Sequence, residues 1–195
     1  MLFVKFKIQD KNKFADFQKL YEHLVKVRQE GFEFYEDKSD LDWDNMTAEE
    51  MDKVFETMFD KVNPEAEEMK RYEQNIPTYS NAFLENYIKR DDPKLGNLDK
   101  QEVLSIFHYL EFDFEVDFNK LSQLEDHIGI VEFSTDNFPF GGLEHFFITL
   151  RSFDLIPIRC FNGFTVNEIS WKSNFEYDLK EQLKQTKAYL KKFEN

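Results

Sequence analysis

The chain has 195 residues, 41% of them hydrophobic and 33% charged, with a net charge of −14 at pH 7. This length and composition predict a globular protein whose core is large enough to fold without disulfides or metals. The negative charge argues against DNA, RNA or an anionic membrane surface as a direct ligand, because those ligands select clustered lysine and arginine. A basic protein partner, a metal cation, or solubility alone remains compatible with this charge.

Cysteine content and hydropathy indicate where the protein works. Cys160 is the one cysteine in the sequence, which excludes an internal disulfide and a zinc site built from several cysteines. The first residues alternate in polarity and lack the basic start and apolar block of a signal peptide. No run approaches the roughly 20 apolar residues of a membrane span. We therefore expect a cytoplasmic protein that does not enter a membrane.

The charge is unevenly distributed along the chain. Residues 1–29 carry seven Lys/Arg and three Asp/Glu, a net charge of +4, whereas residues 30–73 carry five Lys/Arg and sixteen Asp/Glu, a net charge of −11. Most of the imbalance therefore sits in 44 residues. We expect a single domain over residues 1–195, in which residues 40–76 form an acidic helical lobe or flap.

The first half of the chain reads as one strand followed by helices. Residues 2–8 alternate lysine with apolar side chains, which predicts a half-buried strand. Residues 12–29 have apolar side chains at helical spacing. Thr47 and Glu50 have the spacing of a capping box, which predicts a helix from Ala48. Further helices are expected from Pro64 onward, around 80–90 and over 100–110.

Residues 111–118, EFDFEVDF, alternate carboxylates with apolar side chains, which predicts a strand. Its apolar side chains would face the core and its carboxylates would face outward: Glu111, Asp113, Glu115 and Asp117. Three interpretations are open for this acidic face. It is an exposed or edge strand kept soluble by charge, a surface that docks a basic partner, or a catalytic or metal-binding carboxylate pair.

The second half of the chain reads mainly as strands. Residues 119–127 are expected to form a short helical turn, and residues 141–153 a helix between two strands that complete a β-α-β unit. Asn162-Gly163 predicts a hairpin turn, and residues 174–193 predict a closing helix with Leu179, Leu183, Leu190 and Phe193 inward. The fold class is α+β: a mixed or antiparallel sheet of about five strands, with helices packed on one face and an acidic helical segment beside it. The expected strands are residues 2–8, 111–118, 129–134, 155–161 and 164–171.

Metal and catalytic motifs are incomplete in this sequence. Asp40, Asp42 and Asp44 match the start of a calcium loop, but Asn45 and Met51 stand where that loop needs Gly and Glu. The four histidines lack the spacing of a metal motif: His23, His108, His127 and His145. Cys160 lies inside a predicted strand and reads as a buried apolar residue. We therefore predict no catalytic residue, no metal site and no cofactor.

The sequence favours a non-enzymatic acidic binding protein. The expected partner is a basic protein, and the best-fitting type is an inhibitor or immunity protein that neutralises a toxin or nuclease. The residues predicted to bind it are Asp40, Asp42, Trp43, Asp44, Glu111, Asp113, Glu115 and Asp117. The alternative is an enzyme with a carboxylate-rich cleft, with or without a divalent metal, that uses Asp113, Glu115, Asp136 and His127. A third interpretation is a subunit or adaptor of a larger assembly. The sequence makes no prediction of oligomeric state.

Overall fold

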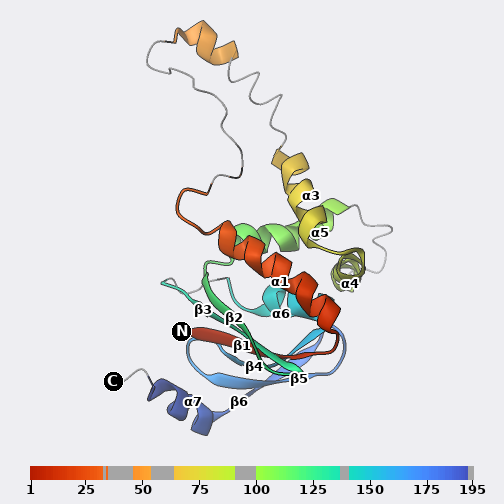
Figure 1. Cartoon of the computed structure of the whole chain (residues 1–195), viewed down its shortest axis with the longest axis vertical. Helices are drawn as coiled ribbons and strands as arrows, with labels where there is room; N and C mark the ends of the chain where they lie inside the picture. Colours follow the sequence, from red (N-terminus) through yellow and green to blue (C-terminus); the bar gives the residue numbers. More distant parts are fainter. Residues whose placement is uncertain (33, 35–45, 54–63, 91–99, 137–140, 193–195) are drawn as a thin grey trace.

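The structure is a computed structural model that describes residues 1–32, 34, 46–53, 64–90, 100–136 and 141–192 (Figure 1). It confirms the α+β class with an antiparallel sheet of six strands, in the order β2-β3-β1-β4-β5-β6. The strands are β1 (Leu2–Ile8), β2 (Asp117–Glu125), β3 (Ile128–Ser134), β4 (Leu155–Phe161), β5 (Val166–Trp171) and β6 (Tyr177–Glu181). The strand predicted over residues 2–8 is confirmed as β1. It lies in the interior of the sheet, between β3 and β4.

The α-helices are α1 (Lys11–Lys26), α3 (Pro64–Asn75), α4 (Thr78–Lys89), α5 (Lys100–His108), α6 (Glu144–Ser152) and α7 (Leu183–Leu190). A π-helix, η2 (Tyr109–Asp113), continues α5. In the described part of the chain no helix is both long and apolar enough to cross a membrane.

The predicted acidic lobe is helical where the structure describes it. Residues 48–53 and α3 are helical, whereas residues 40–45 and 54–63 lie outside the described residues. The predicted capping box is confirmed, since the Thr47 N–H donates to Glu50 Oε2 at 2.9 Å and the Glu50 N–H donates to Thr47 Oγ1 at 3.4 Å. Local sequence alone therefore specifies the start of this helix.

Two interleaved split β-α-β units form the centre of the fold. β3 and β4 lie on either side of β1 and are antiparallel to it, so they run parallel to each other. α6 connects them, which confirms the predicted β-α-β unit but with β1 between its strands. β1 and β2 also run parallel to each other, with β3 between them, and α1 belongs to their connection. The helices α3, α4, α5 and η2 are inserted between α1 and β2.

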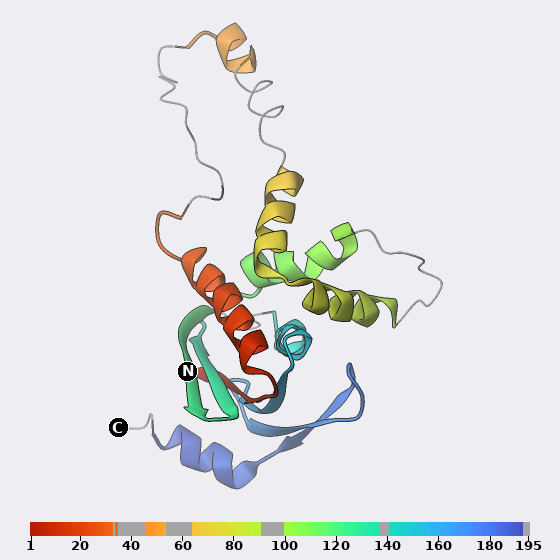
Figure 2. The ribbon, with the colours of Figure 1, turned by 45° about the vertical axis from the view of Figure 1, so that its right-hand side comes forward.

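Phenylalanine builds the core between the sheet and the helices. α1 and α6 cover one face of the sheet, and α3, α4 and α5 lie farther from it (Figure 2). The ring centroid of Phe6 in β1 lies 6.3 Å from that of Phe17 in α1. The Phe17 centroid lies 5.6 Å from that of Phe153 at the end of α6. Phe114, which follows η2, stacks on Phe146 of α6 at 5.4 Å. These ring contacts add to the burial of large apolar side chains.

The predicted layer of helices on one face of the sheet is present, and one described helix lies outside that layer. α7 lies on the opposite face (Figure 2), where Tyr189 packs against Phe3 at 5.2 Å and Phe161 at 4.8 Å. The predicted helix over residues 174–193 is wrong for residues 177–181. They form strand β6, because the hairpin pairs Trp171 with Tyr177. Leu179, Leu183 and Leu190 are consequently exposed, and Phe193 lies outside the described residues.

The predicted strand over residues 111–118 is wrong for most of its length. Helix α5 continues through η2, and strand β2 begins only at Asp117. β2 then runs through most of residues 119–127, where a helical turn was expected, because Phe118 and Leu121 pair with β3 on the core side. The alternation itself persists from Asp113 to Phe118, since the carboxylates there are exposed and the apolar side chains are buried.

Gly129 shows how closely this core is packed. Gly129 faces Phe6 across the β1–β3 pair, and a Cβ atom at Gly129 would lie 2.4 Å from the Phe6 ring. Phe6 is fully buried, so its ring has no room to swing away.

We predict that Gly129→Ala lowers the free energy of unfolding by about 1–3 kcal/mol, because the added methyl overpacks a closed core. Chemical denaturation measures the change. In the double variant Gly129→Ala with Phe6→Leu, the smaller leucine should remove part of the clash. The double variant should therefore lose less unfolding free energy than the sum of the losses in the two single variants. Strictly additive costs would contradict the contact.

Candidate functional site

Glu111 is a buried carboxylate where three helical elements meet. It lies on η2, and its side chain is 0% exposed, whereas the neighbouring Phe112 is 43% exposed. The prediction that Glu111 faces outward is therefore wrong. The π-helix continues the turn of α5, and the inward-facing side of that helix includes Glu111.

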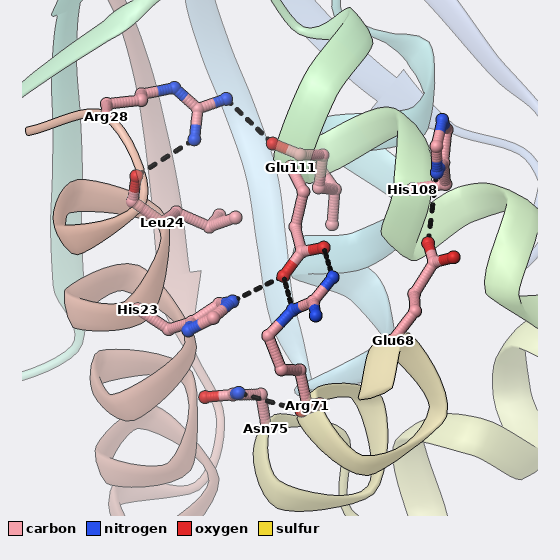
Figure 3. Close-up of polar contacts among 9 residues, drawn as sticks. His23, Leu24, Arg28, Glu68, Arg71, Asn75, His108 and Glu111 are labelled. Carbon is pink, nitrogen blue, oxygen red and sulfur yellow. Dashed lines mark hydrogen bonds and ion pairs between the residues drawn. The ribbon is translucent and has the colours of Figure 1, made fainter. Parts of the chain in front are cut away.

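Two basic side chains surround the Glu111 carboxylate (Figure 3). His23 of α1 places Nε2 at 2.6 Å from Oε1. Arg71 of α3 donates from Nε to Oε1 at 3.0 Å and from its terminal nitrogen to Oε2 at 2.9 Å, a two-bond pairing of guanidinium and carboxylate. We call Glu111, His23 and Arg71 the ion-pair cluster.

The cluster keeps Glu111 ionised despite its burial. Burial alone raises the pKa of the Glu111 carboxyl, but the hydrogen bonds and charges of His23 and Arg71 outweigh burial and hold that pKa below its usual value. His23 and Arg71 are each 13% exposed at the side chain, so water screens the charges weakly. The cluster is therefore an electrostatic contact between α1, α3 and η2.

Arg28 holds the chain that leaves η2. Its guanidinium donates to the backbone carbonyls of Leu24, Leu110, Phe114 and Val116 at 2.7–2.9 Å. Burial lowers the pKa of Arg28 to about 10, opposed by the charges of Asp117 and Glu111. Arg28 thus satisfies carbonyls that no strand or regular helix pairs along residues 110–116.

Aromatic rings cover the ion-pair cluster. The Arg71 guanidinium lies 4.7 Å from the centre of the Phe34 ring, and His23 stacks on Phe107 at 5.8 Å. Phe34 in turn contacts Phe112 at 4.6 Å, and Phe112 contacts the His108 ring at 4.7 Å. This cover excludes water from the charges and leaves the Phe112 ring half exposed on the outside.

An acidic hollow of about 300 Å³ opens beside these residues. It is lined by Arg28, Glu111, Phe112, Phe114, Glu115, Val116, Asp117, Thr135 and Asp136. Three exposed carboxylates are among its lining residues, because the open end of the β2–β3 hairpin brings Asp117 and Asp136 together and Glu115 lies just before β2.

The predicted partner-binding residues have different locations. Glu115 and Asp117 line the acidic hollow, Asp113 is exposed one residue beyond Phe112, and Glu111 belongs to the buried cluster. The remaining four lie outside the described residues: Asp40, Asp42, Trp43 and Asp44. Sequence reasoning missed Asp136 for this surface, although Asp136 follows β3 at the same end of the hairpin at which Asp117 begins β2.

The four residues of the enzyme alternative do not all come together, although Glu115 and Asp136 both line the acidic hollow. His127 lies at the turn of the β2–β3 hairpin, whereas Asp136 follows the opposite end of β3, a strand that itself spans roughly 20 Å at about 3.4 Å per residue. Asp113, Glu115, Asp136 and His127 are all exposed. Within the ranges that the structure describes, no three His, Cys, Asp or Glu side chains are placed to hold a metal ion.

The structure also shows the surroundings of Cys160 and of two histidines. Cys160 is buried in β4, as expected, and burial raises the pKa of its thiol to about 12, which makes it a poor nucleophile. Two of the histidines contact carboxylates, since His23 Nε2 lies 2.6 Å from Glu111 and His108 Nδ1 lies 3.0 Å from Glu68.

Comparisons of this chain with protein-family models, with curated proteins and with solved structures find no match. Its function is therefore argued from the geometry of the acidic hollow and the ion-pair cluster.

We predict that Glu111→Gln lowers the free energy of unfolding by roughly 3 kcal/mol, because the amide keeps the size of the side chain but removes the buried negative charge that Arg71 and His23 contact. Denaturant titration at neutral pH measures the loss. Glu22→Gln is the matched control, since it removes the same charge from an exposed position next to His23 and should change the stability by less than about 0.5 kcal/mol.

The pH dependence of this difference provides a second readout. Because the folded pKa of Glu111 is depressed, its stabilisation is complete above its unfolded pKa of about 4.3 and is lost as the pH falls through the lower folded value. The gap in the free energy of unfolding between wild type and Glu111→Gln should thus shrink as the pH falls below about 4. A gap that does not shrink in this range would contradict the ionised Glu111 carboxylate.

Proposed function

We propose that the protein is a non-enzymatic binding protein that captures a basic protein partner at the acidic hollow. The observation that carries this proposal is the grouping of Glu115, Asp117 and Asp136 around one concave surface, with the exposed ring of Phe112 beside it. Exposed aromatic rings supply contact area at interfaces, and a rim of like charge orients an oppositely charged partner.

The support beneath the hollow favours binding with little rearrangement. Arg28 holds the backbone of residues 110–116, and the ion-pair cluster holds η2 against α1 and α3. A surface fixed in advance loses little conformational freedom when a partner docks, so more of the contact energy remains as affinity. This favours a recognition surface over a cleft that must close around a substrate.

The finer proposal is an inhibitor or immunity-type protein that neutralises a cationic toxin or nuclease. The −11 charge of residues 30–73 would add to the field around the hollow, and Asp40, Asp42, Trp43 and Asp44 remain proposed contacts within that segment. The proposed partner is a protein, without nucleic acid, membrane or cofactor, and the proposed location is the cytoplasm. Long-range attraction would speed association with a basic partner.

We predict that the triple variant Glu115→Gln, Asp117→Asn and Asp136→Asn binds the partner at least roughly tenfold more weakly than the wild type, because the hollow loses its charge. Immobilised wild type and variant would be exposed to an extract of the native host, and retained proteins identified by mass spectrometry. The affinity of the purified partner would then be measured at rising salt, where wild-type binding should weaken.

The matched control is Glu125→Gln, Asp126→Asn and Glu176→Gln, which removes three exposed carboxylates elsewhere on the sheet. Both triple variants change the net charge from −14 to −11, so total charge does not distinguish them. The control should retain the partner as the wild type does. If both triple variants lose binding equally, or if the wild-type affinity does not change with salt concentration, the acidic hollow is not the recognition surface.

A further inference from the structure

Strand β6 is an edge of the sheet, and no described strand lies beyond it. Its neighbour β5 is paired in register Ile169–Leu179, with Gln182 N–H donating to Val166 O at 2.8 Å and Lys172 N–H donating to Glu176 O at 2.9 Å. Since hydrogen-bonded pairs alternate along an antiparallel ladder, the backbone groups of Leu179 point away from β5. Those outward groups are a template for another strand.

We propose that a second copy of this chain pairs with β6, antiparallel and about a two-fold axis at Leu179. In this register Leu179 faces its own counterpart, and the two sheets become one continuous sheet. A two-fold interface uses the same surface on both chains, so it requires a self-complementary strand. The sequence of β6 meets this requirement.

The charges of β6 are complementary to themselves about Leu179. Asp178 precedes Leu179 and Lys180 follows it, so antiparallel pairing sets Asp178 of each copy opposite Lys180 of the other. Both side chains are exposed on the face of the sheet that carries α7, where Asp178 Oδ1 also accepts from Lys172 Nζ of its own chain at 2.7 Å. The two pairs fall at non-hydrogen-bonded positions, where facing side chains are closest.

Apolar side chains reinforce this register. Leu179 is 49% exposed and Leu183, just past the strand, is 64% exposed. In the paired form Leu179, at the centre of β6, packs on its own counterpart. Large exposed apolar side chains at a sheet edge favour association. α7 turns away over β5 and β4, since Thr186 Oγ1 accepts from Val166 N–H and Tyr189 packs on Phe161, which leaves the edge accessible.

Charged side chains at an edge also serve to prevent pairing between chains. The two roles differ in their response to charge reversal. If Asp178 and Lys180 only shield the edge, reversing either charge preserves a charged edge and a monomer. If they pair across a two-fold axis, each reversal places like charges opposite each other twice.

The test is sedimentation equilibrium of the whole chain over a range of concentrations. Wild type should shift from 23.6 kDa toward twice that mass as concentration rises. Asp178→Lys alone and Lys180→Asp alone should each raise the dimer dissociation constant roughly tenfold or more, because two attractive pairs become repulsive. Circular dichroism and thermal unfolding check that both variants remain folded.

Two restorations distinguish this pairing from a general loss of association. The double variant Asp178→Lys with Lys180→Asp exchanges the charges and should dimerise like the wild type. An equimolar mixture of the two single variants should also associate, since Lys faces Asp at both positions of the mixed pair.

A wild type that stays at the mass of one chain up to about 1 mM overturns the proposal. So does a dimer that survives both single reversals, or a failure of both restorations. The proposed basic partner does not enter this test, so the acidic hollow and the β6 edge succeed or fail independently.

Discussion

The structure depends on one buried electrostatic contact, the pairing of Glu111 with Arg71 and His23. An ionised carboxylate without access to water is strongly unfavourable unless charged partners surround it. Here those partners come from α1 and α3, so the contact holds together segments that are far apart in the sequence. It also determines the path of the chain: α5 continues as a π-helix to Asp113, and β2 starts only at Asp117.

The position of the acidic hollow follows from this path. Once Glu111 is drawn inward, Phe112 is turned outward, and the carboxylates from Asp113 onward remain on the surface. Arg28 then fixes the backbone between the π-helix and β2, which sets Glu115 and Asp117 beside Asp136. One inward carboxylate thus supports a surface formed by three outward ones. The acidic stretch combines a structural role with the proposed recognition role.

Local patterns predicted the elements that local interactions decide. The alternation of residues 2–8, the helical spacing of 12–29 and the capping box at Thr47 have their expected counterparts. The hairpin predicted at Asn162-Gly163 is also present, but its strands are joined by the four residues 162–165 instead of a two-residue turn, so β5 begins at Val166 and not at 164. The boundary at Glu111 was not predicted, because two periodicities overlap there. Val103, Phe107, Leu110 and Phe114 have helical spacing, while residues 111–118 alternate. Contact with His23 and Arg71, 88 and 40 residues away, favours the helical path, and no local pattern reports such contacts. β6 was missed for a related reason, since its pairing with β5 overrides leucines at helical spacing.

The most direct measurement is the coupling free energy between Glu111 and Arg71, obtained from a double-mutant cycle with Glu111→Leu and Arg71→Met. Each single variant removes one charge of the Glu111–Arg71 pair and leaves the other buried, whereas the double variant buries neither of these two charges. We expect each single variant to be less stable than the double variant, with a coupling free energy of at least about 2 kcal/mol. Single-variant costs that simply add, with a coupling below about 0.5 kcal/mol, would show that this pair does not hold the structure together.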